Sequence, residues 1–350
     1  MNELRSALEI RYPQERQLST RAQELVVELV ASLPAQGKGD VEKSAQQADA
    51  LLAAIYDDAA DDNVREVYAD LLLERGDVRG ELINLQLQAE GKTTPQRKRE
   101  RALLSAHAFE WLGPLAAVFQ KSGLRYERGF PVAGRVNGQK LSADPKLVGL
   151  ACWTTFEELA VKGWVVPLRA LVHPVLRGLR VLAGADLETA ATLLEAKGPP
   201  RALRSLRTLL YCDEEDEQGL RWWETVLQGA AAPDLRELIV DSTLDHAEVD
   251  ALLTSPLSQR LEHLRFDVQY GQVVEWVQRL SSRHKAPTRL TLHETFRHWN
   301  LTLSKGGDGR WSRLACSPEG RLDAETRRRL KEVLVHIPSG TISELSTPGV

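Results

Sequence analysis

The chain has 350 residues, of which 43% are hydrophobic and 27% charged, and this length is enough for two domains or for one domain and a repeat array. Its 45 Lys and Arg residues and 49 Asp and Glu residues leave a net charge of -4, which argues against a general nucleic-acid-binding or membrane-surface protein. Three widely spaced cysteines (Cys152, Cys212 and Cys316), the lack of a signal-peptide segment and the lack of a membrane-spanning apolar run indicate a cytoplasmic protein without a cysteine metal site.

The first part of the chain has helical periodicity. Residues 1–33 carry an apolar stripe, residues 34–44 have the composition of a linker, and a second helix is expected around Leu51 and Ile55. An acidic stretch at residues 57–63 follows this helix. It lacks the alternating Asp/Asn spacing and the central glycine of an EF-hand, so we favour helix capping over calcium binding for its carboxylates.

Two further helices are predicted between residues 63 and 90. Val64 and Leu72 lie on one helical stripe, Gly76 suits the left-handed position that ends a helix, and Asp77 is placed to cap the next one. We interpret the charged residues here as caps and ion pairs of a tight helical hairpin, with a binding role as the alternative. These charged residues are Asp70, Glu74, Arg75, Asp77 and Arg79.

The same segment resembles the bacterial repeat-companion domain, a family named for its occurrence beside leucine-rich and similar repeats. The resemblance covers about residues 46–89 and departs from the family pattern at Leu71, where Trp is usual, and at Val78, where Pro is usual. It implies a helical partner for repeats and carries over no activity. The matching stretches are Tyr68-Ala69-Asp70, Glu74-Arg75-Gly76-Asp77, Arg79-Gly80-Glu81-Leu82-Ile83 and Leu85-Gln86.

A helix and a strand are expected next. The helix begins with Thr94 as its N-cap and Pro95 as its first residue, continues to Leu112 and ends at Gly113-Pro114. Residues 124–130 alternate like a β-strand, and in the resembled family an Arg-Gly-Phe strand of this kind leads into the repeats. We expect residues 124–152 to cover the first repeat, because the ends of a repeat array need specialised covers.

One phrase recurs between residues 156 and 292: an apolar residue, two others, Leu, one other, and an apolar residue. The middle leucines follow one another at intervals of 20 to 30 residues, a spacing typical of leucine-rich repeats. Residues two apart on a strand share a face, so the phrase predicts short strands with one buried side. The copies are Phe156-Leu159-Val161, Leu176-Leu179-Val181, Leu206-Leu209-Tyr211, Leu235-Leu238-Val240, Leu261-Leu264-Phe266 and a shorter Leu290-Leu292.

Helical stretches separate several of these copies. Asp186 and Asp245 are placed to cap two of them, and Val273, Val274 and Val277 mark a third. One strand and one helix cannot bury an apolar face alone, so neighbouring units must stack. We therefore predict an α/β fold in which an N-terminal α-helical domain precedes a leucine-rich-repeat-like α/β solenoid with a C-terminal β-hairpin and helix cap.

After the repeats, two strand-like runs surround the glycine-rich residues 305–309, and a last helix is expected over residues 322–335. We favour a hairpin turn over a phosphate-binding loop for the glycines, because no Gly-Lys-Ser/Thr motif or helix start follows them. The predicted domains are residues 1–44 (helical segment and linker), 45–123 (helical repeat-companion domain), 124–155 (adaptor), 156–298 (solenoid) and 299–350 (C-terminal cap).

The sequence contains no convincing catalytic or metal-binding set. His293 and His298 are five residues apart instead of the four that a helical zinc motif needs. The acids at residues 213–217 would raise the pKa of the neighbouring Cys212 thiol, and the basic residues 327–331 lack the interleaved aromatics of a nucleic-acid groove. We predict no enzyme activity, no cofactor and no metal.

The strand residues that alternate with the inward leucines are expected to line an open sheet surface. Its centre is apolar and its flanks carry both charges, which is the usual anatomy of a protein-binding face. The predicted partner-binding residues are Arg180, Leu182, Leu210, Glu237, Ile239, Asp241, His263, Arg265 and Asp267.

Two functions follow from this surface. The first is a scaffold or adaptor that binds another protein on the repeat sheet. The alternative is an inhibitor or immunity-type regulator that blocks an enzyme or toxin through the acidic residues 213–217. Nucleic-acid, membrane and small-molecule partners are not expected.

Overall fold

The computed structural model divides the chain into two units, residues 1–52 and residues 53–350. The described part of the first unit belongs to α3 (Lys38–Asp57), and the helix predicted in residues 1–33 lies outside the described residues. The predicted linker is wrong from Lys38 onwards, because the Glu, Lys, Ala and Gln residues that follow favour a helix. The described residues are 38–88, 91–163, 168–195, 202–209, 217–229, 231–269, 272–281, 287–295, 299–306, 311–316 and 324–334.

Acidic side chains at the start of the second unit cap a helix. α4 (Asp62–Glu74) begins after Asp61, whose carboxylate accepts a hydrogen bond from the backbone N–H of Asn63 at 2.9 Å. Such a bond satisfies one of the unpaired N–H groups of the first helical turn. The capping prediction is confirmed at Asp61, and no group of metal-binding side chains occurs among the described residues.

The next helix also begins at its predicted cap. Gly76 adopts a left-handed conformation (φ 73°) after α4, and Asp77 caps α5 (Val78–Leu87). The N-cap predicted at Thr94 is wrong by one residue. Thr93 caps α6 (Thr94–His107) and forms a capping box with the third helical residue. The helix ends earlier than predicted, and a 3-10 segment follows it over Glu110–Ala117.

The chain then enters the sheet through a hairpin. β1 (Arg125–Glu127) and β2 (Phe130–Asn137) are antiparallel, so the prediction of one strand over residues 124–130 is wrong. The turn between them contains Arg128 and Gly129, both in the left-handed region at φ 52° and 79°. Alternation of polar and apolar residues does not reveal such a turn, because the pattern continues on both sides of it.

Helix α5 holds this turn. Gln86 accepts a hydrogen bond from the N–H of Gly129 at 2.8 Å and donates one to the carbonyl of Tyr126 at 3.0 Å, while Arg79 Nε donates to the carbonyl of Gly129 at 3.3 Å. Ile83 packs so closely that a Cβ on Gly129 would lie 2.1 Å from its side chain. Residues of α5 therefore attach the N-terminal helices to the first hairpin.

The strands of the described residues form one ten-stranded sheet in chain order, from β1 to β10. Neighbours from β2 to β8 pair in parallel, and the remaining pairs are antiparallel, including the predicted C-terminal hairpin β9–β10. The sheet is open, with β1 and β10 at its edges. The remaining bounds are β3 (Glu158–Lys162), β4 (Val181–Ala185), β5 (Ser205–Thr208), β6 (Glu237–Thr243), β7 (His263–Val268), β8 (Arg289–Glu294), β9 (Trp299–Lys305) and β10 (Trp311–Cys316).

The parallel register aligns one buried leucine from each strand. These leucines are at most 2% exposed, and they are Leu159, Leu182, Leu206, Leu238, Leu264 and Leu290. Two of the predicted phrase copies are therefore wrong in register. Leu182 takes the place assigned to Leu179, and Leu206 takes the place assigned to Leu209, which is 49% exposed. Apolar residues recur three positions apart on both sides of these strands, and this made the register ambiguous.

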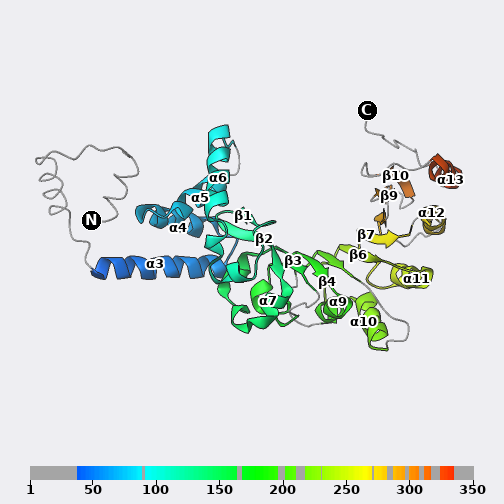
Figure 1. Cartoon of the computed structure of the whole chain (residues 1–350), viewed down its shortest axis with the longest axis horizontal. Helices are drawn as coiled ribbons and strands as arrows, with labels where there is room; N and C mark the ends of the chain where they lie inside the picture. Colours follow the sequence, from blue (N-terminus) through cyan, green and yellow to red (C-terminus); the bar gives the residue numbers. More distant parts are fainter. Residues whose placement is uncertain are drawn as a thin grey trace, which may run out of the picture. The chain divides into compact units, whose positions relative to one another are not determined.

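Helices follow most of the parallel strands, and Figure 1 shows α9 to α12 on the same side of the sheet. Their buried side chains, including Ala190, Leu252 and Trp276, share one core with the strand leucines. The predicted caps are confirmed at Asp186 and Asp245, which accept backbone N–H bonds at 2.8 and 2.7 Å. The helices are α7 (Gly138–Ala143), α8 (Leu168–Leu171), α9 (Leu187–Glu195), α10 (Glu217–Gln228), α11 (His246–Thr254), α12 (Val273–Ser281) and α13 (Ala324–Leu334), with 3-10 turns at Pro145–Leu147, Ala151–Thr155 and Pro174–Leu176.

The fold is thus mixed α/β, with helices at its amino-terminal side and an open, mostly parallel sheet after them. None of the described helices combines the length and the apolar content that crossing a membrane requires.

Candidate protein-binding face of the sheet

Alternate residues of the parallel strands form a second face of the sheet, opposite the helices. We call it the open face, because its side chains alternate with the buried leucines and are largely half-buried or exposed. Its members on β3 to β8 are Glu158, Ala160, Val181, Ala183, Ser205, Arg207, Glu237, Ile239, Asp241, His263, Arg265, Asp267, Arg289, Thr291 and His293.

The part of the open face on β3 and β4 is small and mainly apolar. Ala160 and Ala183 are direct neighbours in the register, and Val181 lies beside Glu158. Arg125 of β1 pairs with both carboxylate oxygens of Glu158 at 3.0 and 3.1 Å. Because this ion pair lies on the exposed surface, we expect it to fix side-chain orientation more than stability.

The part on β5 to β9 carries a continuous chain of hydrogen bonds, which we call the polar ladder. Ser205 donates to Glu237 at 2.6 Å, and the other oxygen of Glu237 lies 2.6 Å from His263 Nδ1. His263 Nε2 lies 2.9 Å from the Thr291 hydroxyl, which lies 3.0 Å from the hydroxyl of Thr302. Five neighbouring strands therefore contribute one side chain each to a single network.

The electrostatics of the polar ladder fix its central proton. The hydrogen bond from His263, assisted by that from Ser205, lowers the pKa of the Glu237 carboxyl to about 2 although partial burial opposes this shift. An ionised carboxylate only accepts hydrogen bonds, so the imidazole carries its proton on Nδ1. Nε2 then accepts from Thr291 in the neutral ring and donates to it in the charged ring.

A second polar group lies beside the polar ladder. Arg207 Nε donates to Asp241, and His293 Nδ1 lies 2.8 Å from the Asn300 side-chain oxygen. Burial raises the pKa of Asp267, and the nearby Asp241 raises it further. One oxygen of Asp267 and the Nε of Arg265 are buried without a hydrogen-bond partner in the described part of the chain. Each such atom carries an uncompensated cost of desolvation.

The order Thr291–His263–Glu237 is that of a nucleophile, a base and an orienting acid. However, Thr291 is only 6% exposed and is also bonded to Thr302, so its hydroxyl is engaged inside the network. The adjacent backbone amides take part in the parallel strand ladder and are poorly placed to stabilise an oxyanion. The arrangement is suited to presenting fixed polar groups on a surface.

Most of the predicted partner-binding residues lie together on this surface. The structure brings together Glu237, Ile239, Asp241, His263, Arg265 and Asp267 on the open face. The predicted outward orientation is wrong for Leu182, which is fully buried because the strand register is shifted. Arg180 precedes β4 and pairs with Glu157 at 3.3 Å, away from the open face, and Leu210 lies outside the described residues.

Ser205, Arg207 and Thr302 were missed by the sequence argument. Ser205 and Arg207 flank Leu206, so placing Leu206 at the middle of its phrase would have identified both. The signal was present, since Leu203, Leu206 and Thr208 have the same spacing as the other copies. Thr302 carries no such signal, because its antiparallel strand comes after the repeats.

The remaining candidate sites offer less chemistry. Burial raises the pKa of the Cys152 thiol to about 11, which opposes a nucleophilic role. Arg328 pairs with Glu325 and Glu332 on its own helix, both at 2.7 Å, as expected for a solvated face. Cys212, His298 and the acidic residues 213–216 lie outside the described residues.

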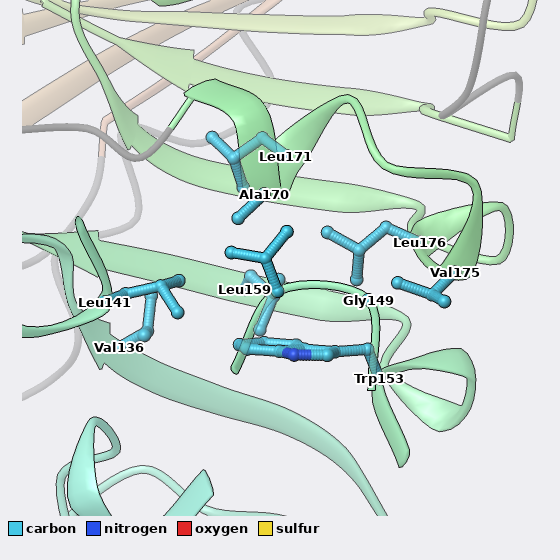
Figure 2. A pocket seen from close by; sticks show the side chains of 10 residues that line it. Val136, Leu141, Gly149, Trp153, Leu159, Ala170, Leu171, Val175 and Leu176 are labelled. Atoms are coloured by element: carbon cyan, nitrogen blue, oxygen red, sulfur yellow. The ribbon is translucent and has the colours of Figure 1, made fainter. Parts of the chain in front are cut away.

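A small cavity lies in the core beside β2 and β3 (Figure 2). Trp153, Leu159 and Leu176 are among the apolar side chains around it, and its volume is about 10 Å³. This space is at the lower limit for one water molecule and offers no polar partner to hold it. We interpret it as a packing gap.

Comparison of the chain with protein-family models, with curated proteins and with solved structures gives no match. The fold defines an α/β protein with a mostly parallel sheet whose strands follow chain order.

Proposed function

We propose that this protein is a non-enzymatic adaptor, in which a helical repeat-companion domain supports a leucine-rich-repeat-like solenoid. Three features support this proposal: the strands follow chain order, their leucines align in one buried row, and the family-like helix α5 holds the first hairpin. In a repeat array each unit contacts mainly its neighbours, and such arrays present extended surfaces to partners.

The partner in this proposal is another protein, bound on the β5–β8 part of the open face. The observation that carries the proposal is the group of half-buried residues of both charges around Arg265 and Asp267. A protein surface with complementary donors and acceptors would pair with the accessible polar atoms of these residues. Ile239 adds an apolar contact at the centre of this area.

The test is affinity capture from an extract of the native source, followed by mass spectrometry. We expect the Ile239→Glu/Arg265→Glu double variant to lose the proteins that the wild-type chain retains, because it places two carboxylates beside Asp267. Lys98→Glu is the control, since Lys98 is exposed on α6, which contributes no residue to the open face. Equal retention of the same proteins by the double variant would contradict the proposal, provided that its thermal unfolding matches that of the control.

A further inference from the structure

A second site lies away from the open face, in a cleft of about 530 Å³. The cleft is bounded by the turn after α3, by α4, by the β1–β2 turn and by the residues that precede β3 and β4. Its volume is within the range of small-molecule pockets, about 300–1,000 Å³. Four acidic residues and four arginines line it, and we call it the arginine cleft after the latter: Asp57, Asp58, Glu127 and Glu157 with Arg65, Arg128, Arg177 and Arg180.

Arg65 is the most unusual residue of the arginine cleft, because its side chain is only 2% exposed. Its Nη1 donates to the carbonyl of Asp61 at 3.2 Å and lies 3.5 Å from Asp62 Oδ1. Its Nε is buried and has no hydrogen-bond partner in the described part of the chain. A guanidinium normally engages its donors when it is buried, so this group is incompletely satisfied.

The surroundings of Arg65 add a second cation and an aromatic ring. The guanidinium lies 5.3 Å from the centre of the Phe130 ring, which also contacts Arg79 at 4.6 Å. Burial, followed by the nearby charge of Arg128, lowers the pKa of Arg65 to about 10. The carboxylates nearby therefore do not compensate fully for the burial of this charge, and a further anion would do so.

Arg128 has a strained backbone conformation. It has a φ of 52°, a left-handed conformation that is unfavourable for a side chain with a Cβ. The bonds from Gln86 and Arg79 to Gly129 maintain this turn, and Arg128 Nη1 lies 3.3 Å from Asp62. The chain thus retains an arginine at a position where glycine would fit the backbone better.

The other two arginines come from the residues that precede β4. Arg177 donates to the backbone carbonyls of Tyr56 and Asp57, and Arg180 pairs with Glu157 at 3.3 Å. Both side chains are about half exposed, at 54% and 53%. They are therefore accessible to a ligand in the arginine cleft.

We propose that the arginine cleft binds a small molecule through a carboxylate or phosphate group held by Arg65 and Arg128. The guanidinium group is suited to both anions, because it presents donors in a planar fork. Phe130 forms an apolar wall beside the anion, and Arg177 and Arg180 contact a second polar part of the ligand. This site is separate from the open face, so its occupation does not depend on the adaptor proposal.

The test uses the full-length chain and three probes: inorganic phosphate, citrate and adenosine monophosphate. Binding is measured by calorimetry and by the rise in Tm, in a buffer without competing anions. We expect at least one probe to bind the wild-type chain and to raise its Tm. The relative affinities of phosphate and citrate identify which anion the cleft prefers. No binding of any probe in the millimolar range would overturn the proposal.

The decisive variant is Arg128→Gly, because it removes the guanidinium while relieving the left-handed strain. We expect unchanged or higher Tm without ligand and a loss of affinity of about tenfold or more. Arg65→Lys should lose affinity as well. If this substitution at a buried position unfolds the chain, Arg180→Gln is measured in its place. Arg97→Gln on α6 removes one exposed positive charge as the control. Equal affinity in Arg128→Gly and in this control would overturn the proposal.

Discussion

The two faces of the sheet differ in how strictly the chain repeats. On the helix-covered face, six aligned strands each place a fully buried leucine in the same row. On the open face, the equivalent positions change from mainly alanine and valine on β3 and β4 to mainly charged, imidazole and hydroxyl side chains on β5 to β8. Packing imposes one residue type on the first face, and solvent leaves the second free to carry specific chemistry.

The largest expected effect comes from placing the same charge at two neighbouring leucines, one on the buried face and one exposed. We expect Leu206→Asp to destabilise the fold by more than about 4 kcal/mol, because it buries an unpaired carboxylate. Leu209→Asp should change stability by less than about 1 kcal/mol, because Leu209 is 49% exposed. Urea unfolding followed by circular dichroism measures both. Equal destabilisation would restore the phrase register that the structure corrects.

The next effect concerns the hairpin at which the sheet begins. Gly129→Ala should destabilise the fold by about 2–3 kcal/mol, because its Cβ would lie 2.1 Å from the buried Ile83 side chain and its φ is positive. Gly76→Ala has the same backbone strain with nothing within 4 Å, so we expect about 1 kcal/mol. A larger loss in Gly76→Ala would show that α5 does not hold the turn as described.

The open face should make a smaller, pH-dependent contribution to stability. The pKa of Glu237 is lowered from 4.5 to about 2, so its stabilisation is complete above pH 4.5 and is lost as the pH falls toward 2. Glu237→Gln should remove about 1–3 kcal/mol at neutral pH and flatten the dependence of Tm on pH in this window. The matched control is Glu188→Gln on α9, an exposed residue that should keep the wild-type profile. A wild-type profile in Glu237→Gln would exclude the carboxylate as the titrating group.

The smallest effect is expected at the end of the polar ladder. Thr291→Val removes a hydroxyl bonded to both His263 and Thr302, and we expect a loss of about 1 kcal/mol. Thr302→Val removes only the last bond and should cost about half as much. Denaturant unfolding of both variants measures the difference. The reverse order would indicate that Thr302, and not Thr291, is the central hydroxyl.

Much of the core face was predictable, because buried packing repeats and repetition is visible in a sequence. The caps at Asp61, Asp77, Asp186 and Asp245 were also correct, since their effect is local. The open face was predicted only in part. Its polar ladder depends on the alignment of five strands, and an error of three residues at Leu209 was enough to hide Ser205 and Arg207.

The arginine cleft could not be predicted, for a different reason. Its lining residues are distributed along the chain from Tyr56 to Ala202, so the fold brings them together over more than one hundred positions. Arg128 lies in the β1–β2 turn, which the sequence pattern predicted as part of a continuous strand, so its left-handed conformation was not expected.

The sequential order of the strands has a consequence for synthesis of the protein. Each parallel strand pairs with the strand that left the ribosome immediately before it, so closure of each step involves only a short stretch of chain. The sheet can therefore grow outward from its first hairpin while translation continues. Throughout this growth the newest strand leaves unpaired backbone groups at the growing edge, ready for its successor.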